Sequence, residues 1–118
     1  MQLMTYNNSK DILRGEVYWV NIDPAIGSEV KRTRPAVIIS NNIQNKISTR
    51  VVVIPITSQV KTIYPFEAKI MVVNKDAKAL ADQIRTIDKL RLGSCIEKLS
   101  KSEMTDIEKA IKLTLSLN

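Results

Sequence analysis

The strongest strand signal in the chain is Arg50-Val51-Val52-Val53-Ile54-Pro55-Ile56, in which every residue after the arginine is apolar. A short apolar run of this kind is typical of a strand that is buried on both faces. Such a strand needs neighbours that cover it on either side. The segment is therefore predicted to lie at the centre of a sheet.

Further segments on both sides of this run also have strand character, because they are rich in β-branched and aromatic residues or alternate between apolar and polar positions. Asp23-Pro24 is expected to stop the first of them, and Pro35 is expected to open the second, where a missing backbone amide costs least. Asn41 and Asn42 are predicted to end that second strand. The predicted ranges are 16–22, 36–40, 66–73 and, on weaker alternation, 79–87.

The end of the chain predicts a helix. Ser100 and Glu103 match a capping box, in which the two side chains satisfy backbone amides at a helix start. Apolar residues then recur at spacings of three and four, at Met104, Ile107, Ile111 and Leu115. Strands followed by a terminal helix predict a small α+β domain with a curved antiparallel sheet or open barrel. We expect one domain over residues 14–118, preceded by a tail over residues 1–13.

The charge of the chain favours anionic partners. The 118 residues carry 18 Lys and Arg against 12 Asp and Glu, a net charge of +6, and the isoelectric point is near 9.6. Polyanions and acidic protein segments are the partners that such a balance suits. The basic loop from Gly27 to Pro35 contains one acidic residue, Glu29, and no acidic residue follows between Val30 and Phe66. The charged positions in that stretch are Lys31, Arg32, Arg34, Lys46, Arg50 and Lys61.

Composition also excludes several kinds of chemistry. The chain has no histidine, so Ser-His and Cys-His nucleophile pairs are absent. Its one cysteine, Cys95, allows neither an intrachain disulfide nor a cysteine-cluster zinc site. Asp23, Glu29 and Asp82 show no metal-ligand spacing, so neither a metal nor another cofactor is expected. Because no segment approaches a membrane span, we expect a cytoplasmic protein without a membrane partner.

Cleavage within RNA is one reaction that needs no histidine, because the ribose 2′-hydroxyl is itself the nucleophile. A guanidinium holds two phosphoryl oxygens at once, and a nearby hydroxyl adds a third contact as charge develops. Arg34 and Thr57 are the candidates for these roles. Taken alone, an arginine such as Arg34 is most often a surface charge, and Thr-Ser-Gln after a strand is most often a turn.

Short blocks along the chain occur in a recognisable order. They are Arg14-Gly15-Glu16-Val17-Tyr18-Trp19-Val20, Asp23-Pro24, Gly27-Ser28-Glu29, Arg34-Pro35-Ala36-Val37, Ile56-Thr57-Ser58-Gln59, Tyr64-Pro65-Phe66-Glu67, Ala81-Asp82-Gln83-Ile84 and Ile87-Asp88-Lys89. In this order the blocks closely resemble the MazF/PemK family of toxins from bacterial type II toxin–antitoxin modules. The resemblance runs from Arg14 to the C-terminal helix.

The resemblance implies a fold, an activity and partners. The fold is a small SH3-like open β-barrel of mostly antiparallel strands, with a C-terminal helix and a short accessory helix. The activity is that of a sequence-selective, metal-independent endoribonuclease, which cuts single-stranded RNA such as mRNA and so stops translation and growth. It leaves 2′,3′-cyclic phosphate and 5′-hydroxyl ends. The implied partners are a second copy of the chain and an antitoxin with an acidic, partly disordered segment.

The family's catalytic arginine falls on Arg34 and its catalytic threonine on Thr57. Since arginine holds its proton up to a pKa above ~12, it is a poor general base. Glu29 is a candidate for accepting the 2′-hydroxyl proton, although it is equally compatible with a solvated turn. The expected RNA-binding residues are Ser28, Lys31, Arg32, Ser58, Gln59, Lys61 and Gln83. Gln83 is expected either to bind a base or to satisfy nearby backbone.

Some positions depart from the family pattern or allow other interpretations. Val30-Lys31-Arg32 stand where family members commonly have glutamine and small residues, so loop mobility and RNA sequence preference are open. Tyr18 and Trp19 are expected in the core or in a dimer interface. A gyrase-binding toxin of the related CcdB type is disfavoured, because the chain lacks a tryptophan-containing tail. A catalytically silent RNA-binding module is the remaining alternative.

Overall fold

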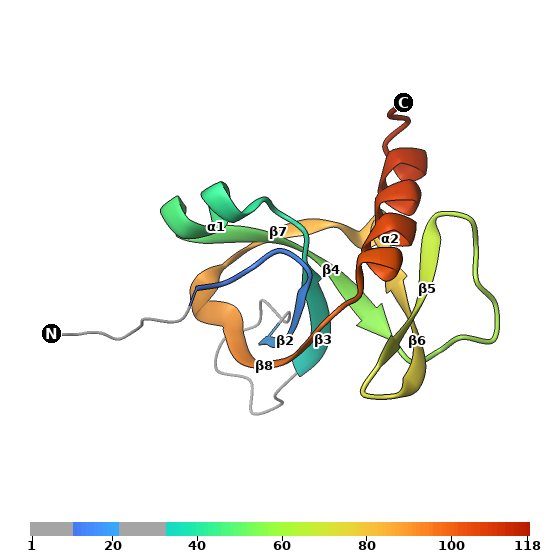
Figure 1. The fold of residues 1–118 in the computed structure, drawn as a ribbon, viewed down its shortest axis with the longest axis horizontal. Helices are drawn as coiled ribbons and strands as arrows, with labels where there is room; N and C mark the ends of the chain where they lie inside the picture. Colours follow the sequence, from blue (N-terminus) through green and yellow to red (C-terminus); the bar gives the residue numbers. More distant parts are fainter. Residues whose placement is uncertain (1–10, 22–32) are drawn as a thin grey trace, which may run out of the picture.

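The computed structural model describes residues 11–21 and 33–118. The strands are β2 (Glu16–Asn21), β3 (Thr33–Ile38), β4 (Arg50–Thr57), β5 (Glu67–Val72), β6 (Lys75–Leu80), β7 (Arg85–Asp88) and β8 (Leu92–Lys98). The helices are α1 (Asn42–Ile47) and α2 (Lys101–Thr114), with short 3₁₀ turns η2 (Ala81–Gln83) and η3 (Lys89–Arg91). Figure 1 shows the chain folded as a curled sheet with α2 lying against it.

The strands form one antiparallel sheet in the order β5-β6-β4-β3-β2-β8, and β7 also pairs with β4. The curl brings the two edges of the sheet together. Glu97 on β8 accepts a hydrogen bond of 2.7 Å from the backbone amide of Val73, which follows β5. Glu103 accepts one of 2.8 Å from the amide of Met71 on β5 itself. These carboxylates occupy edge amides that would otherwise be open to another strand. The predicted α+β open barrel is confirmed.

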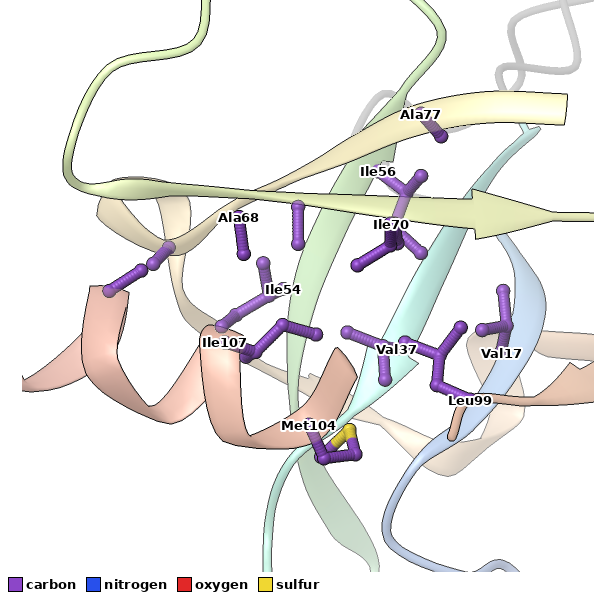
Figure 2. Packing of buried hydrophobic residues seen from close by; sticks show 13 residues of the cluster. Val17, Val37, Ile54, Ile56, Ala68, Ile70, Ala77, Leu99, Met104 and Ile107 are labelled. Carbon is purple, nitrogen blue, oxygen red and sulfur yellow. The ribbon is translucent and has the colours of Figure 1, made fainter. Parts of the chain in front are cut away.

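Strand β4 lies at the centre of the sheet, as its apolar run predicts. Its alternate residues point to opposite faces, and each face has its own hydrophobic cluster. Figure 2 shows the larger cluster between α2 and the sheet, with Ile54 of β4 beside Ile107 of the helix. Val51 and Val53 contribute to the cluster on the other face, which also contains Tyr18. The prediction that this strand is buried on both faces is confirmed.

Helix α2 begins as the sequence predicts. The Ser100 hydroxyl accepts a hydrogen bond from the Glu103 amide at 3.1 Å, and the Glu103 carboxylate accepts one from the Ser100 amide at 2.9 Å. Met104 and Ile107 are buried against the sheet. Leu115 lies past the end of the helix and is exposed, so the predicted apolar face does not extend that far.

The strand predicted over residues 79–87 is wrong. Its first residues end β6, the turn η2 follows, and β7 begins only at Arg85. The apolar positions Leu80, Ile84 and Ile87 belong to different elements, so their apparent alternation does not reflect one strand. Strand β6 was not predicted, because the charged residues at its start hide its alternation.

Other elements also differ from the prediction in part. Strand β3 starts at Thr33, so Arg34 lies on the strand rather than in the preceding loop. Asn41 does end the extended segment, but it does so as the N-cap of α1, and its side chain accepts a hydrogen bond from the Gln44 amide at 2.8 Å. Strand β8 was missed because much of it is partly exposed and mixed in polarity. Among the described residues, no helix is long and apolar enough to cross a membrane.

Candidate functional site

Arg34 and Thr57 lie at the same edge of two neighbouring strands. The ladder between β3 and β4 pairs Ala36 with Pro55. Arg34 is two residues from Ala36 toward the start of β3, and Thr57 is two residues from Pro55 toward the end of β4. Because the strands are antiparallel, these two directions coincide. The sheet therefore brings together two side chains that are far apart in sequence.

Arg34 and Thr57 line one cavity of about 470 Å³. Ser58 lines it as well, directly after the strand. The remaining wall comes from β2, β3, β4, the β5–β6 hairpin and β8. Its residues are Trp19, Pro35, Ile56, Val72, Val73, Lys75, Asp76, Ala77 and Ile96. The cavity thus combines an apolar wall with a guanidinium and two hydroxyls, which suits a ligand that has both flat apolar parts and an anionic group.

Trp19 lines this cavity, although the sequence did not mark it as a site residue. Its neighbours Val17, Tyr18 and Val20 are buried, whereas Trp19 is 44% exposed. Trp19 pairs with Pro35 across the β2–β3 ladder, so its ring stands beside the strand that carries Arg34. The expectation for both residues is the core or a dimer interface. Tyr18 lies in the core and Trp19 does not, while a dimer-interface role for Trp19 stays a prediction. No local pattern in the sequence separates Trp19 from its buried neighbours.

A second cavity of about 280 Å³ adjoins Arg34. Gln83 and Arg85 line it together with Arg34, Pro55, Ile56 and Leu80. Arg34 therefore faces both cavities and lies where they meet. Arg85 was not recognised in the sequence, although it follows the Ala81-Asp82-Gln83-Ile84 block by one residue. It brings a second guanidinium to the same edge of the sheet.

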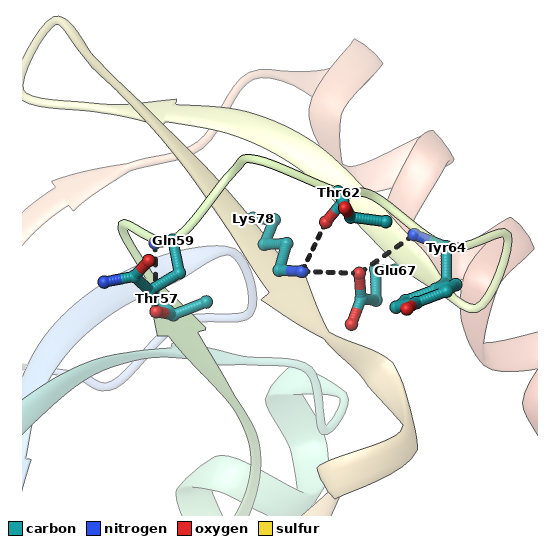
Figure 3. A network of polar contacts seen from close by, with 6 residues as sticks. All are labelled: Thr57, Gln59, Thr62, Tyr64, Glu67 and Lys78. Atoms are coloured by element: carbon teal, nitrogen blue, oxygen red, sulfur yellow. Dashed lines mark hydrogen bonds and ion pairs between the residues drawn. The ribbon is translucent and has the colours of Figure 1, made fainter.

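The Thr57 hydroxyl is held by the loop that it begins. Its Oγ1 accepts a hydrogen bond from the Gln59 amide at 3.1 Å, as Figure 3 shows. A hydroxyl that accepts in this way still has its proton to donate. Thr57 is half-buried, while Ser58 and Gln59 are exposed. Lys61 is exposed further along the loop and lines neither of the two cavities.

Several predicted site residues lie outside the described residues. They are Ser28, Glu29, Lys31 and Arg32, and with them Asp23 of the metal alternative. Within residues 11–21 and 33–118, no group of three carboxylate or cysteine side chains lies close enough together to hold a metal ion. The described part of the predicted site thus consists of Arg34, Thr57, Ser58, Gln59, Lys61 and Gln83.

The arrangement can stabilise a phosphoryl group that gains negative charge. Arg34 is exposed and lines both cavities, and no ion pair within residues 11–21 and 33–118 involves its guanidinium. A guanidinium binds two phosphoryl oxygens in one plane, and the Thr57 hydroxyl is placed to donate to the same group. The chemistry that these residues support is positioning and charge stabilisation at phosphorus.

Comparison with known proteins gives consistent matches over nearly the whole chain. Residues 13–115 match the family described as PemK-like, MazF-like toxin of type II toxin–antitoxin system. Endoribonuclease MazF9 of Mycobacterium tuberculosis is 39% identical over 113 residues, which cover 88% of this chain and 96% of that protein. Endoribonuclease MazF of Staphylococcus epidermidis is 39% identical over 112 residues, covering 91% of this chain and 93% of that one.

Solved structures share the fold. A mycobacterial endoribonuclease in complex with its cognate antitoxin superimposes with a TM-score of 0.77 at 25% identity, covering 91% of this chain and 97% of that one. MazF of Deinococcus radiodurans also gives a TM-score of 0.77, at 24% identity, and covers 92% and 99% of the two chains. The second match supports the fold alone.

Proposed function

This chain belongs to the PemK-like, MazF-like toxins of type II toxin–antitoxin systems and is an endoribonuclease. We propose that its substrate is single-stranded RNA and that Arg34 and Thr57 form the site at which the RNA is cut. The observation that carries the proposal is the cavity that both residues line. Relatives named as endoribonucleases also favour an enzyme over the gyrase-binding and catalytically silent alternatives. We propose in addition that the toxin acts in the cytoplasm.

In the proposed reaction the RNA supplies its own nucleophile. The 2′-oxygen forms a bond to the adjacent phosphorus, and the bond from phosphorus to the 5′-oxygen of the next nucleotide breaks. The 2′-hydroxyl loses its proton and the departing 5′-oxygen gains one, which leaves a 2′,3′-cyclic phosphate and a 5′-hydroxyl. Arg34 and Thr57 stabilise the charge that builds on the phosphoryl oxygens. Glu29 stays our candidate for accepting the 2′-hydroxyl proton.

The two cavities on either side of Arg34 suggest how the RNA lies. With the reacting phosphate at Arg34, one neighbouring nucleotide enters the cavity with Trp19, and the other enters the cavity with Gln83. Bases of single-stranded RNA stack on exposed aromatic rings and pair with side-chain amides. Trp19 then stacks on a base, and Gln83 hydrogen-bonds to one. Ser28, Lys31, Arg32, Ser58, Gln59 and Lys61 extend the proposed RNA contacts.

The same basic character suits the proposed protein partners. A mycobacterial relative has been solved in complex with its cognate antitoxin. For this chain, which carries a net charge of +6, we propose an antitoxin whose acidic, partly disordered segment folds onto the toxin and covers the RNA-binding cavities. We also propose that the toxin forms a homodimer.

The proposed function is tested by incubating the protein with a long single-stranded RNA in excess EDTA. We expect cleavage, with 2′,3′-cyclic phosphate and 5′-hydroxyl ends on the fragments. Arg34→Ala and Thr57→Ala should each lower the rate by ~10²-fold or more, because each removes a contact to the charged phosphoryl group. Intact RNA with the wild-type protein, or 5′-phosphate products, would refute the proposal.

Matched controls separate these effects from a loss of fold or of overall charge. Arg50 is exposed at the other end of β4, so Arg50→Ala removes the same charge away from the cavities. Thr86 is exposed on β7, so Thr86→Ala removes a threonine hydroxyl elsewhere in the sheet. Both variants should retain the wild-type rate. Equal losses in the site variants and the controls would mean that Arg34 and Thr57 have no special role.

A further inference from the structure

The loop after Thr57, residues 58–66, is tied to the sheet by a nearly buried ion pair. Lys78 on β6 is only 8% exposed, and its Nζ lies 2.8 Å from Glu67 Oε1 at the start of β5. Burial raises the pKa of Glu67, but the hydrogen bond from Lys78, the Tyr64 amide and the charge of Lys78 lower that pKa by more, so the carboxyl stays ionised. The proposed reaction does not use this pair.

Both members of the pair also bind the backbone of the loop. Lys78 Nζ donates to the carbonyl oxygen of Thr62 at 2.7 Å, and Glu67 Oε1 accepts from the amide of Tyr64 at 3.0 Å. Figure 3 shows these bonds converging on Lys78 and Glu67 from the loop above them. Because they end on main-chain atoms, they fix the path of the loop itself.

Aromatic contacts reinforce the same end of the loop. The Tyr64 ring stacks on Phe66 with 5.4 Å between ring centroids, and the Lys78 ammonium lies 5.9 Å from the Tyr64 centroid. A cation over an aromatic ring is attracted by the negative face of that ring. Lys78 therefore meets the loop at the Thr62 carbonyl and the Tyr64 ring, and its partner Glu67 meets it at the Tyr64 amide.

The pair lies directly beside the proposed reaction site. Thr57 is the register partner of Lys78 in the β4–β6 ladder, so the residue that holds the loop also adjoins the strand end that carries the threonine. The loop is then fixed near its start, where the Gln59 amide binds Thr57 Oγ1, and again at Thr62 and Tyr64. Ser58 and Gln59 lie at the first of these points, and Lys61 lies between the two.

We propose that Lys78 and Glu67 are positioning residues that set the RNA sequence preference, by holding the loop in the shape in which Ser58, Gln59 and Lys61 meet the RNA. This inference rests on the proposed function. Thr57 is itself held by backbone pairing with β6, so loss of the ion pair moves the loop and leaves Thr57 in place. The loss therefore weakens RNA binding and selectivity more than it slows the chemical step.

The best variant is Lys78→Met together with Glu67→Met. Either change alone leaves an unpaired buried charge, which destabilises a fold strongly, whereas removing both charges avoids that penalty. The single variant Lys78→Arg keeps a cationic donor at this position and should retain most of the activity and selectivity of the wild type. Lys69→Met is the matched control, because Lys69 is the exposed register partner of Lys78 on β5.

The first measurement compares cleavage of a preferred RNA site with cleavage of the same site altered at one base. In the double variant we expect KM for the preferred site to rise ~10-fold while kcat changes less than ~3-fold, and discrimination between the two sites to fall ~10-fold. Lys69→Met should leave all three values unchanged. An equal fall of kcat on both sites, with KM and discrimination unchanged, would overturn the proposal.

The second measurement follows the loop without RNA, by the rate at which trypsin cuts the native protein after Lys61. Cleavage of a folded protein reports local opening. We expect the double variant to be cut ~10-fold faster than the wild type, and Lys69→Met to be cut at the wild-type rate. Equal rates for the double variant and the wild type would show that the loop does not depend on the ion pair, and would overturn the proposal. A wild-type protein that leaves RNA intact would instead refute the proposed function, and with it the role in RNA selection, whatever the trypsin rates show.

Discussion

Arg34 on β3 and Thr57 on β4 line the same cavity from the ends of neighbouring antiparallel strands. The sheet provides this proximity, since the pairing of Ala36 with Pro55 fixes which residues reach that edge. The proposed catalytic pair is held on strands rather than loops, because the ladders pair Arg34 with Val20 on β2 and Thr57 with Lys78 on β6.

Arg34→Lys tests whether the shape of the guanidinium matters beyond its charge. Lysine keeps the positive charge but is a point charge that cannot bind two phosphoryl oxygens in one plane. We expect kcat/KM for RNA to fall by ~10²-fold, nearly as far as in Arg34→Ala. Arg50→Lys is the control and should be fully active. Near-normal activity of Arg34→Lys would show that charge alone suffices.

Trp19→Ala tests the proposed stacking wall. Stacking of a base on an aromatic side chain contributes about 1–3 kcal/mol, so we expect KM to rise by ~10-fold or more with a smaller change in kcat. Trp19→Phe should recover most of the affinity, because it restores an aromatic face. The affinity for a short single-stranded RNA, measured by fluorescence anisotropy with Arg34→Ala as the background, checks this directly. Unchanged affinity in Trp19→Ala would exclude stacking.

Much of the fold follows from local sequence patterns. The apolar run of β4, the capping box of α2 and its buried positions Met104 and Ile107 all have periodic or cap signals that do not depend on distant residues. Prediction of strands from apolar spacing fails where the spaced residues belong to different elements, as Leu80 and Ile87 do. It also fails for β8, which is partly exposed and is held as a strand by its pairing with β2.

The candidate site also contains residues that the sequence indicates and residues that only the fold brings together. Arg34 and Thr57 are candidates from the sequence because the reaction chemistry and the family blocks both point to them, and the structure places both at one cavity. Trp19 and Arg85 were missed, because their place at the cavities depends on which strands are neighbours and on which face each side chain points. No local pattern in the sequence carries that information.

Val73→Asn should stabilise the protein. Val73 and Asn74 form the two-residue turn between β5 and β6, and both have positive φ, 51° and 62°. A β-branched residue is strained there, whereas asparagine favours this conformation at such hairpin turns. We expect the free energy of unfolding to rise by about 1 kcal/mol, measured by urea denaturation. Val72→Asn, one residue earlier on the strand, should be destabilising.

Protonation of Glu103 should lower the free energy of unfolding below about pH 4.5. Partial burial raises the pKa of Glu103, but hydrogen bonds from the Ser100 and Met71 amides lower it by more, so it lies below the usual value of 4.5. A depressed folded-state pKa stabilises the fold above the unfolded value, and this stabilisation is lost as pH falls from about 4.5 through the folded pKa. Urea midpoints should therefore drop in that range. Glu103→Gln should show a smaller drop, and Asp106→Asn on the same helix should behave as the wild type.

The most direct test of the central claim is cleavage of an RNA whose mapped cut site carries a single 2′-deoxy nucleotide. If the 2′-hydroxyl is the nucleophile that Arg34 and Thr57 serve, that one linkage should stay intact while the unmodified RNA is cut to a 2′,3′-cyclic phosphate. Cleavage of the modified linkage at the normal rate would contradict the account, because it would require water as the nucleophile.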